Sequence, residues 1–303
     1  MRALPEIPID GQRLDLEGRR LWLHRLGEAG PTVVFLPGAG LIGADYWPLH
    51  EAAGRLAASV IYDRGGTGSS DAIALPRTAA SAAHELQALL AAANAPGPYI
   101  LVGHSLGGAY ARRFAQLYPD RTAGLLLLDP AHEGYGALPG PSFADQIAMI
   151  PRLVRALAGM KAFYRPMFAR MLAAWPTGLR DWLIDYHLRF WRRTLAETAN
   201  LQRAVLAEVA DGGPLPGRPL IVLTAMGIDP FMAAFSPLPY LQALNASKRV
   251  FYDDLARSVR HGENRPLADA GHSTLHTDRP DAVIQAIEDL VAAALHTGLS
   301  SPD

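Results

Sequence analysis

Short apolar runs alternate with amphipathic stretches along most of the chain. Four such runs occupy residues 32–36, 59–63, 99–103 and 124–129, and a fifth at 219–225 follows after a gap of about ninety residues. These runs are apolar at nearly every position rather than at every second one. That is typical of strands that helices cover on both faces. The pattern therefore predicts an α/β protein with a mostly parallel sheet.

Helical periodicity and one hairpin account for much of the remaining chain. Residues 79–95 and 106–118 carry apolar side chains at helical spacing. Near the N-terminus, residues 12–26 alternate in hydrophobicity around Glu17 and Gly18. This alternation predicts an antiparallel hairpin beside the parallel strands.

The gap between the fourth and fifth runs differs from the rest of the chain. Residues 135–202 contain apolar residues at helical spacing with arginines on other faces. Pro151 and Pro166 are expected to break this stretch into short helices. We expect a helical subdomain here, inserted into a core that is formed by residues 1–134 and 203–303.

Several methionines and aromatic residues gather in this insertion. They either pack as the ordinary core of a small subdomain or form an adaptable apolar face that lines a binding cavity, a role that suits methionine. On the second interpretation, Met160, Met167 and Met171 are candidate substrate-binding residues. A membrane-surface helix is disfavoured because the prolines interrupt the amphipathic stretch.

Composition narrows the class of protein. The 303 residues carry a net charge of −1, so nothing favours nucleic acid or acidic lipid as a partner. The absence of cysteine excludes disulfides, thiolate nucleophiles and cysteine-bound metals. Neither a signal peptide nor an apolar stretch of about 18 residues is visible, so no membrane span is expected. We expect a cytoplasmic protein that acts on a small molecule.

Glycines directly after the first run raise the question of a dinucleotide site. Gly38, Gly40 and Gly43 have the spacing G-x-G-x-x-G, and Asp63 follows twenty residues later. This is the pattern of a dinucleotide-binding βαβ unit. However, the helix of such a unit would run through Pro48, which removes a backbone donor and clashes with the preceding turn. Pro48 fits better at the start of a helix, so no nucleotide cofactor is expected.

A more specific motif lies farther along the chain. Residues 103–107 read Gly-His-Ser-Leu-Gly, a G-x-S-x-G pattern that an apolar strand enters and an amphipathic helix leaves. This context predicts a nucleophile elbow, with Ser105 at a sharp strand-to-helix turn. The N-terminus of the following helix favours negative charge that develops near the serine. Ser105 is therefore the candidate nucleophile.

At this point the chain resembles the α/β-hydrolase superfamily over nearly its whole length. The segment "VVFLPGAG" resembles the oxyanion loop, "YDRGGTGSSD" the stretch after the next strand, "GHSLGG" the elbow, and "DAGHSTLHTDRPDAVIQAI" the histidine loop before the last helix. Their order and spacing together are specific. The resemblance implies the α/β-hydrolase fold, a mostly parallel sheet flanked by helices, with a helical cap between the fourth and fifth apolar runs.

The resemblance also implies a backbone oxyanion hole, which explains the glycines of the first loop. By position, Ala39 and Leu106 are its two donors. The chain departs from the family at Pro37, where histidine is very often found. No metal ion or organic cofactor is implied.

The base and its neighbours follow from the same comparison. A serine hydroxyl needs an imidazole to take its proton as it attacks, and His272 lies on the loop that the resemblance assigns to this base. His104 is expected to point away from the reaction. His276 forms an H-x-x-x-H pattern with His272, but no third ligand lies nearby, so no metal site is expected. Asp63 is expected to stabilise a local turn.

Two carboxylates compete for the third position of a triad. Asp129 ends the fourth run, where a strand end holds a side chain rigidly, and Asp229 follows the fifth. The superfamily most often uses the later acid, and a recognisable minority uses the earlier one. The later loop has one residue fewer between Gly227 and Asp229 than the usual pattern. Asp129 is therefore favoured, and Asp229 is the alternative acid.

Together these features predict a serine hydrolase that cleaves a carboxylic ester or a related acyl derivative through a Ser-His-Asp triad and an acyl-enzyme. The expected partner is a small, apolar acyl substrate. The same fold and residues also serve acyl transfer, perhydrolysis, and cleavage of amides or C–C bonds. A ligand receptor with a vestigial triad is the alternative from a different class.

Overall fold

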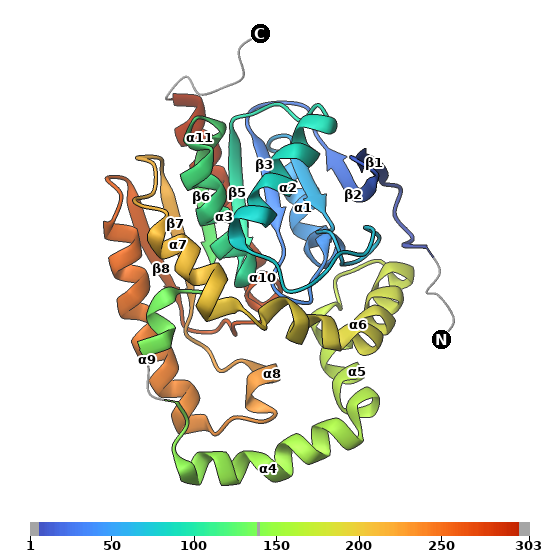
Figure 1. The fold of residues 1–303 in the computed structure, drawn as a ribbon, viewed down its shortest axis with the longest axis vertical. Coiled ribbons are helices and arrows are strands. Elements are labelled where there is room, and N and C mark those ends of the chain that lie inside the picture. The colour runs from blue at the N-terminus through green and yellow to red at the C-terminus, as the bar shows by residue number, and fades with distance from the viewer. Residues whose placement is uncertain (1–5, 138–139, 297–303) are drawn as a thin grey trace.

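An eight-stranded, mostly parallel sheet forms the centre of the molecule (Figure 1). The computed structural model describes residues 6–137 and 140–296. The strand order is β1-β2-β4-β3-β5-β6-β7-β8, in which β2 runs antiparallel to β1 and β4 and the other pairs are parallel. The strands are β1 (Gln12–Leu16), β2 (Arg19–Leu26), β3 (Thr32–Leu36), β4 (Ser59–Tyr62), β5 (Tyr99–His104), β6 (Thr122–Leu128), β7 (Leu220–Ala225) and β8 (Gly262–Leu267). The predicted fold class and the hairpin are confirmed.

The five apolar runs form β3 to β7, and every residue of these strands is buried. Helices cover both faces of the sheet: α2, α3 and α9 pack over one apolar cluster, and α1 and α11 over the other. In the described ranges, no helix is long and apolar enough to cross a membrane. The α-helices are α1 (Trp47–Gly54), α2 (Ala79–Ala92), α3 (Leu106–Leu117), α4 (Phe143–Ala158), α5 (Met160–Met171), α6 (Thr177–Thr198), α7 (Ala207–Asp211), α8 (Pro230–Ala233), α9 (Leu238–Arg257), α10 (Leu275–Asp278) and α11 (Pro280–His296).

Strand β8 is absent from the sequence prediction. Its sequence, GENRPL, has neither an apolar run nor a regular alternation. Among the described strands, β8 is the last of the sheet and pairs with β7 alone. An edge strand needs neither full burial nor a complete set of backbone donors, so it tolerates polar residues and a proline.

Helices α4, α5 and α6 lie between β6 and β7 in the chain and form an arc at the lower side of the view in Figure 1. The prediction that the prolines break this stretch is wrong, since Pro151 lies inside α4 and Pro166 inside α5. A proline leaves the carbonyl four residues earlier without a donor. Here those carbonyls belong to the exposed residues Ile147 and Ala162, where water can donate instead. The break falls at Gly159.

The first glycine loop has the structure that its proline predicts. Pro48 is the second residue of α1, and a 3₁₀-helix over Gly43–Tyr46 precedes it. Asp63 accepts hydrogen bonds from the backbone N–H groups of Gly43 (2.9 Å) and Ser69 (2.7 Å). Asp63 thus ties this loop to the turn after β4, a local structural role.

Candidate active site

Ser105 lies at the sharp turn between β5 and α3. Its φ of 50° and ψ of −117° fall in a region that L-amino acids rarely adopt. A Cβ atom at Gly107 would lie 2.0 Å from the carbonyl oxygen of Leu36, and one at Gly103 would lie 2.7 Å from the carbonyl oxygen of Gly107. The two glycines therefore permit this turn to pack closely, and the strand–turn–helix geometry agrees with the sequence prediction.

Ser105, His272 and Asp129 lie together beyond the carboxyl ends of β5, β8 and β6. His272 Nε2 is 3.0 Å from Ser105 Oγ, and His272 Nδ1 is 2.6 Å from Asp129 Oδ2. Because an ionised carboxylate only accepts hydrogen bonds, Nδ1 carries the imidazole proton and Nε2 can accept from the serine hydroxyl. The three side chains form a continuous hydrogen-bonded chain, the Ser105–His272–Asp129 chain.

Asp129 is buried and held from several directions. Its Oδ1 accepts from the backbone N–H of Ala225 (2.9 Å), and its Oδ2 also accepts from the buried ammonium of Lys248 in α9 (3.0 Å). Burial alone would raise the pKa of the Asp129 carboxyl, but Lys248 and the hydrogen bond from His272 hold this pKa below its ordinary value. The carboxylate is therefore ionised at neutral pH. Sequence reasoning missed Lys248, which no motif marks.

Asp229, the alternative acid, has different partners. Its Oδ1 accepts from the backbone N–H of Met232 (2.7 Å) and caps α8, while its Oδ2 accepts from the backbone N–H of Ser273. In the described part of the chain, no hydrogen bond joins Asp229 to the ring of His272. Asp229 thus contacts the backbone of the histidine loop rather than the imidazole.

The two expected oxyanion donors flank the serine. Leu106 is the first residue of α3, where backbone N–H groups have no acceptor within the helix. Ala39 lies on the loop after β3, which passes beside the serine: a Cβ atom at Gly38 would lie 3.5 Å from Ser105 Cβ. Within residues 6–137 and 140–296, the N–H of Ala39 donates to no backbone or side-chain acceptor.

A sequence model of the alpha/beta hydrolase family matches residues 33–286. This chain belongs to the alpha/beta hydrolase family. The match includes the glycine loop, the elbow and the histidine loop, which are the segments that the fold brings together around Ser105.

The chain is similar in sequence to an uncharacterized protein and in structure to an esterase and an epoxide hydrolase. The uncharacterized protein YqjL of Bacillus subtilis is 36% identical over 108 residues, which cover 36% of this chain and 43% of YqjL. A thermophilic esterase from Thermogutta terrifontis has a TM-score of 0.59 at 22% identity, with 94% of this chain and 99% of the esterase covered. The epoxide hydrolase CorEH has a TM-score of 0.66 at 16% identity, with 93% and 98% covered. At these identities the structural likeness concerns the fold, and the matched segments span less than half of the first curated relatives.

Two further histidines, His104 and His276, lie close to His272 or to each other. His104 Nε2 donates to the backbone carbonyl of His272 (2.8 Å), and its Nδ1 accepts from the hydroxyl of Tyr46 (2.7 Å). Burial, and next the proximity of His272, lower the pKa of His104 to about 4, so its ring is neutral at pH 7. His276 is buried beside the rings of Tyr46 and His104. In the described ranges, no cluster of three His, Cys, Asp or Glu side chains could hold a metal ion.

A cavity of about 790 Å³ opens onto Ser105 and His272. Its described lining contains aromatic, aliphatic, hydroxyl and histidine side chains but no Asp, Glu, Lys or Arg. Of the three candidate methionines, Met171 lines the cavity. Met167 is not among the described lining residues, and the side chain of Met160 lies outside the described residues. The wall opposite the sheet comes largely from α5 and α6.

Proposed function

We propose that the protein is a serine hydrolase that cleaves a carboxylic ester or a related acyl derivative through an acyl-enzyme on Ser105. The observation that carries this proposal is the Ser105–His272–Asp129 chain beside an apolar cavity. The serine is the nucleophile, the imidazole is the general base, and Asp129 orients the imidazole. Ala39 and Leu106 provide the backbone donors of the oxyanion hole.

The roles follow from where charge and protons must move. Ser105 Oγ attacks the acyl carbon while His272 Nε2 takes its proton, and the carbonyl electron pair moves onto oxygen. The N–H groups of Ala39 and Leu106 stabilise this oxyanion. His272 then returns the proton to the leaving alcohol. Water, activated by the same imidazole, hydrolyses the acyl-enzyme and restores the serine.

The cavity indicates the substrate class. An uncharged, largely apolar lining stabilises a neutral, apolar acyl substrate, because a charged group would lose its hydration without gaining a partner. Residues 135–202, which include α4, α5 and α6, act as a helical cap on a core of residues 1–134 and 203–303. In this proposal the cap selects the substrate and the core performs the chemistry.

Turnover and labelling together test the proposal. The protein should hydrolyse members of a p-nitrophenyl ester series from acetyl to palmitoyl, and a fluorophosphonate probe should modify Ser105 in stoichiometric amount. Peptide mass spectrometry locates the modified residue. A protein that neither turns over any ester nor reacts with the probe, yet binds an apolar ligand, would instead be a receptor built on this fold.

Widening of one side chain tests the role of the cap. Met171→Trp should lower the ratio of kcat/KM for the palmitoyl ester to that for the acetyl ester by roughly tenfold or more, because the indole takes space that a long acyl chain needs. Met167→Trp is the matched control, since Met167 lies on the same helix and is not among the described lining residues. Equal ratios in the wild type, Met171→Trp and Met167→Trp would show that Met171 does not affect the preference for acyl chain length.

The buried lysine gives a prediction about pH. Lys248→Met should move the acid limb of the kcat/KM profile to higher pH by roughly one unit. In the variant, no ammonium offsets the negative charge of Asp129. The pKa of Asp129 therefore rises, and the Asp129–His272 pair binds a proton more readily. Because the imidazole must be neutral to accept a proton, activity is then lost at a higher pH.

Ester hydrolysis measured between about pH 5 and 9 checks this shift. Lys161→Met is the control, because Lys161 is the other lysine of the chain and is exposed on α5. An acid limb of Lys248→Met that coincides with those of the wild type and Lys161→Met would contradict the prediction.

A further inference from the structure

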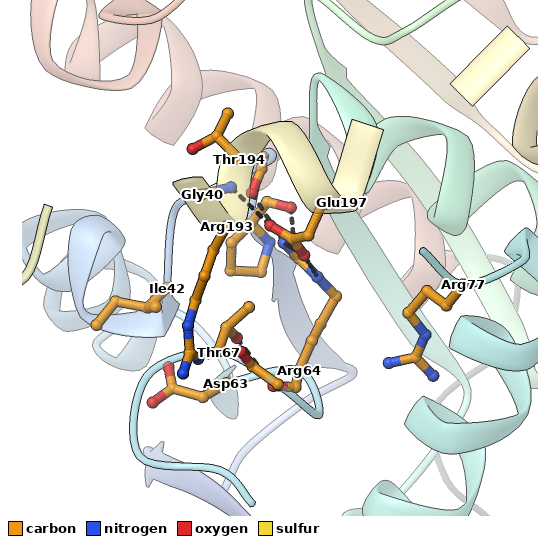
Figure 2. A network of polar contacts seen from close by, with 12 residues as sticks. Gly40, Ile42, Asp63, Arg64, Thr67, Arg77, Arg193, Thr194 and Glu197 are labelled. Carbon is orange, nitrogen blue, oxygen red and sulfur yellow. Dashed lines mark hydrogen bonds and ion pairs between the residues drawn. The ribbon is translucent and has the colours of Figure 1, made fainter. Parts of the chain in front are cut away.

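A buried ion pair joins helix α6 of the cap to the loop over residues 37–40, which we call the oxyanion loop (Figure 2). Arg64, just after β4, is paired with Glu197 in the last turn of α6: its Nη2 and Nε donate to Glu197 Oε1 at 2.8 Å and 3.1 Å. Both side chains are about 1% exposed. The proposed mechanism uses neither residue.

Arg64 also fixes the first half of the oxyanion loop. Its Nη1 donates to the carbonyl oxygen of Pro37 (2.5 Å) and its Nη2 to that of Gly38 (2.9 Å). The carbonyl of Gly38 and the N–H of Ala39 belong to one trans peptide unit and point in opposite directions. A guanidinium that holds the Gly38 carbonyl on one side therefore directs the Ala39 N–H to the other.

Glu197 fixes the next peptide unit of the loop. Its second oxygen, Oε2, accepts from the backbone N–H of Gly40 at 2.7 Å. Gly40 has a φ of +74°, and a Cβ atom there would lie 1.9 Å from Thr194 Oγ1 of α6. The helix thus packs directly on the loop. The peptide units before and after Ala39 are both held by the same ion pair.

We propose that Arg64 and Glu197 are positioning residues that aim the Ala39 N–H at the oxyanion, so that the cap completes the oxyanion hole as well as enclosing the substrate. This inference rests on the proposed function, since it takes Ala39 as an oxyanion donor. Helix α6 then has two roles. Trp191, Thr194 and Leu195 line the cavity, and Glu197 holds the oxyanion loop.

The test variants must stop the ion pair from holding the oxyanion loop without leaving one of its two charges buried and unpaired. Loss of one partner alone would leave the other ionised and unpaired, whereas apolar replacement of a whole buried pair is often tolerated. The principal variant is therefore Arg64→Met/Glu197→Leu. A second variant, Arg64→Lys, keeps the charge of the pair, but one ammonium cannot reproduce the planar fork that spans two carbonyls and a carboxylate.

The chain offers a matched control pair. Arg77 Nη1 donates to Glu85 Oε1 at 2.7 Å, and both side chains are about as buried as the first pair. Neither contacts the oxyanion loop, and Arg77 stands apart from the linked residues in Figure 2. Glu85 Oε1 also accepts from the backbone N–H of Gly65, the residue after Arg64, at 3.0 Å. The control is therefore Arg77→Met/Glu85→Gln, which removes an ion pair of comparable burial and keeps a side-chain oxygen for this N–H.

The readouts separate transition-state stabilisation from general structure. An interaction made only in the transition state lowers kcat with little change in KM. In Arg64→Met/Glu197→Leu, kcat should fall by roughly 10²-fold, a loss comparable to removal of one oxyanion donor. Affinity for an alkyl trifluoromethyl ketone should fall in parallel, because Ser105 adds to its carbonyl carbon, the proton passes to His272 and an oxyanion forms. Affinity for the matching non-fluorinated ketone, and the pH profile, should stay unchanged.

The results that overturn the inference are distinct from those that overturn the function. The inference fails if either test variant folds with wild-type circular dichroism, is labelled at Ser105, and retains wild-type kcat and trifluoromethyl ketone affinity. It also fails if KM alone rises, or if the control Arg77→Met/Glu85→Gln loses kcat equally. A wild-type protein that is not labelled at Ser105 would instead overturn the proposed function itself.

Discussion

Ser105→Ala should lower kcat/KM for p-nitrophenyl acetate by at least about 10³-fold and abolish labelling by a fluorophosphonate probe. Removal of the hydroxyl leaves only substrate binding and the oxyanion donors to stabilise the transition state, and these account for a residual acceleration over water. The substitution deletes one partly exposed hydroxyl oxygen that hydrogen-bonds to His272. Thermal unfolding should therefore stay close to that of the wild type.

A second serine–histidine pair provides the control. Ser59 Oγ lies 2.7 Å from His50 Nδ1, a shorter contact than that of Ser105, but Ser59 is fully buried within β4 and does not line the cavity. Ser59→Ala should retain activity and labelling. Wild-type labelling of Ser105→Ala, or loss of activity only in Ser59→Ala, would contradict the assignment of the nucleophile.

Asp129→Asn should lower kcat by roughly 10²–10⁴-fold, near the loss that follows amidation of a triad aspartate. An asparagine presents either an amide N–H or a neutral oxygen to His272 Nδ1, so it no longer enforces the tautomer with a free Nε2. Asp229→Asn should cost less than about tenfold, because this side chain accepts from backbone N–H groups and an amide oxygen preserves one of those bonds.

Stability must be separated from catalysis in this comparison. Asp129→Asn also leaves the ammonium of Lys248 buried without its anion, which destabilises the fold. The double variant Asp129→Asn/Lys248→Met removes both charges and should unfold nearer the wild-type temperature while remaining inactive at about pH 8, where the shifted acid limb of Lys248→Met has little effect. A larger loss in Asp229→Asn than in Asp129→Asn would transfer the orienting role to Asp229.

Local sequence was sufficient for the strands that build the core and for the elbow. Residues of β3 to β7 are apolar on both faces, so burial under two layers of helices follows from composition alone. Gly103 and Gly107 stand where any Cβ atom would collide with backbone. This steric requirement is visible in the sequence because both glycines belong to the five consecutive residues 103–107. Features of this kind depend on neighbours in the chain and can be predicted from it.

Elements that depend on their environment are predicted wrongly or not at all from local sequence. The polar segment GENRPL becomes β8 because it lies at the edge of the sheet, where only one neighbour must be satisfied. Pro151 and Pro166 lie inside helices whose residues four positions earlier, Ile147 and Ala162, are exposed, so that water can reach the carbonyls that lack a donor. Propensity describes an average environment, so it fails where exposure at one position alters the cost of an unpaired group.

The sequence by itself determined the fold class and, through motifs, the segments that surround the candidate site: the glycine loop, the elbow and the histidine loop. Only the tertiary structure decided which charged side chains meet there. Asp129 meets Lys248 across 119 residues of chain, and Arg64 meets Glu197 across 133. Such pairs are selected by burial, since a buried charge requires a partner wherever the chain supplies one. No local pattern encodes that encounter. Which of the two acids contacts the ring of His272, and that helix α6 is joined to the loop over residues 37–40, are therefore seen only in the folded chain.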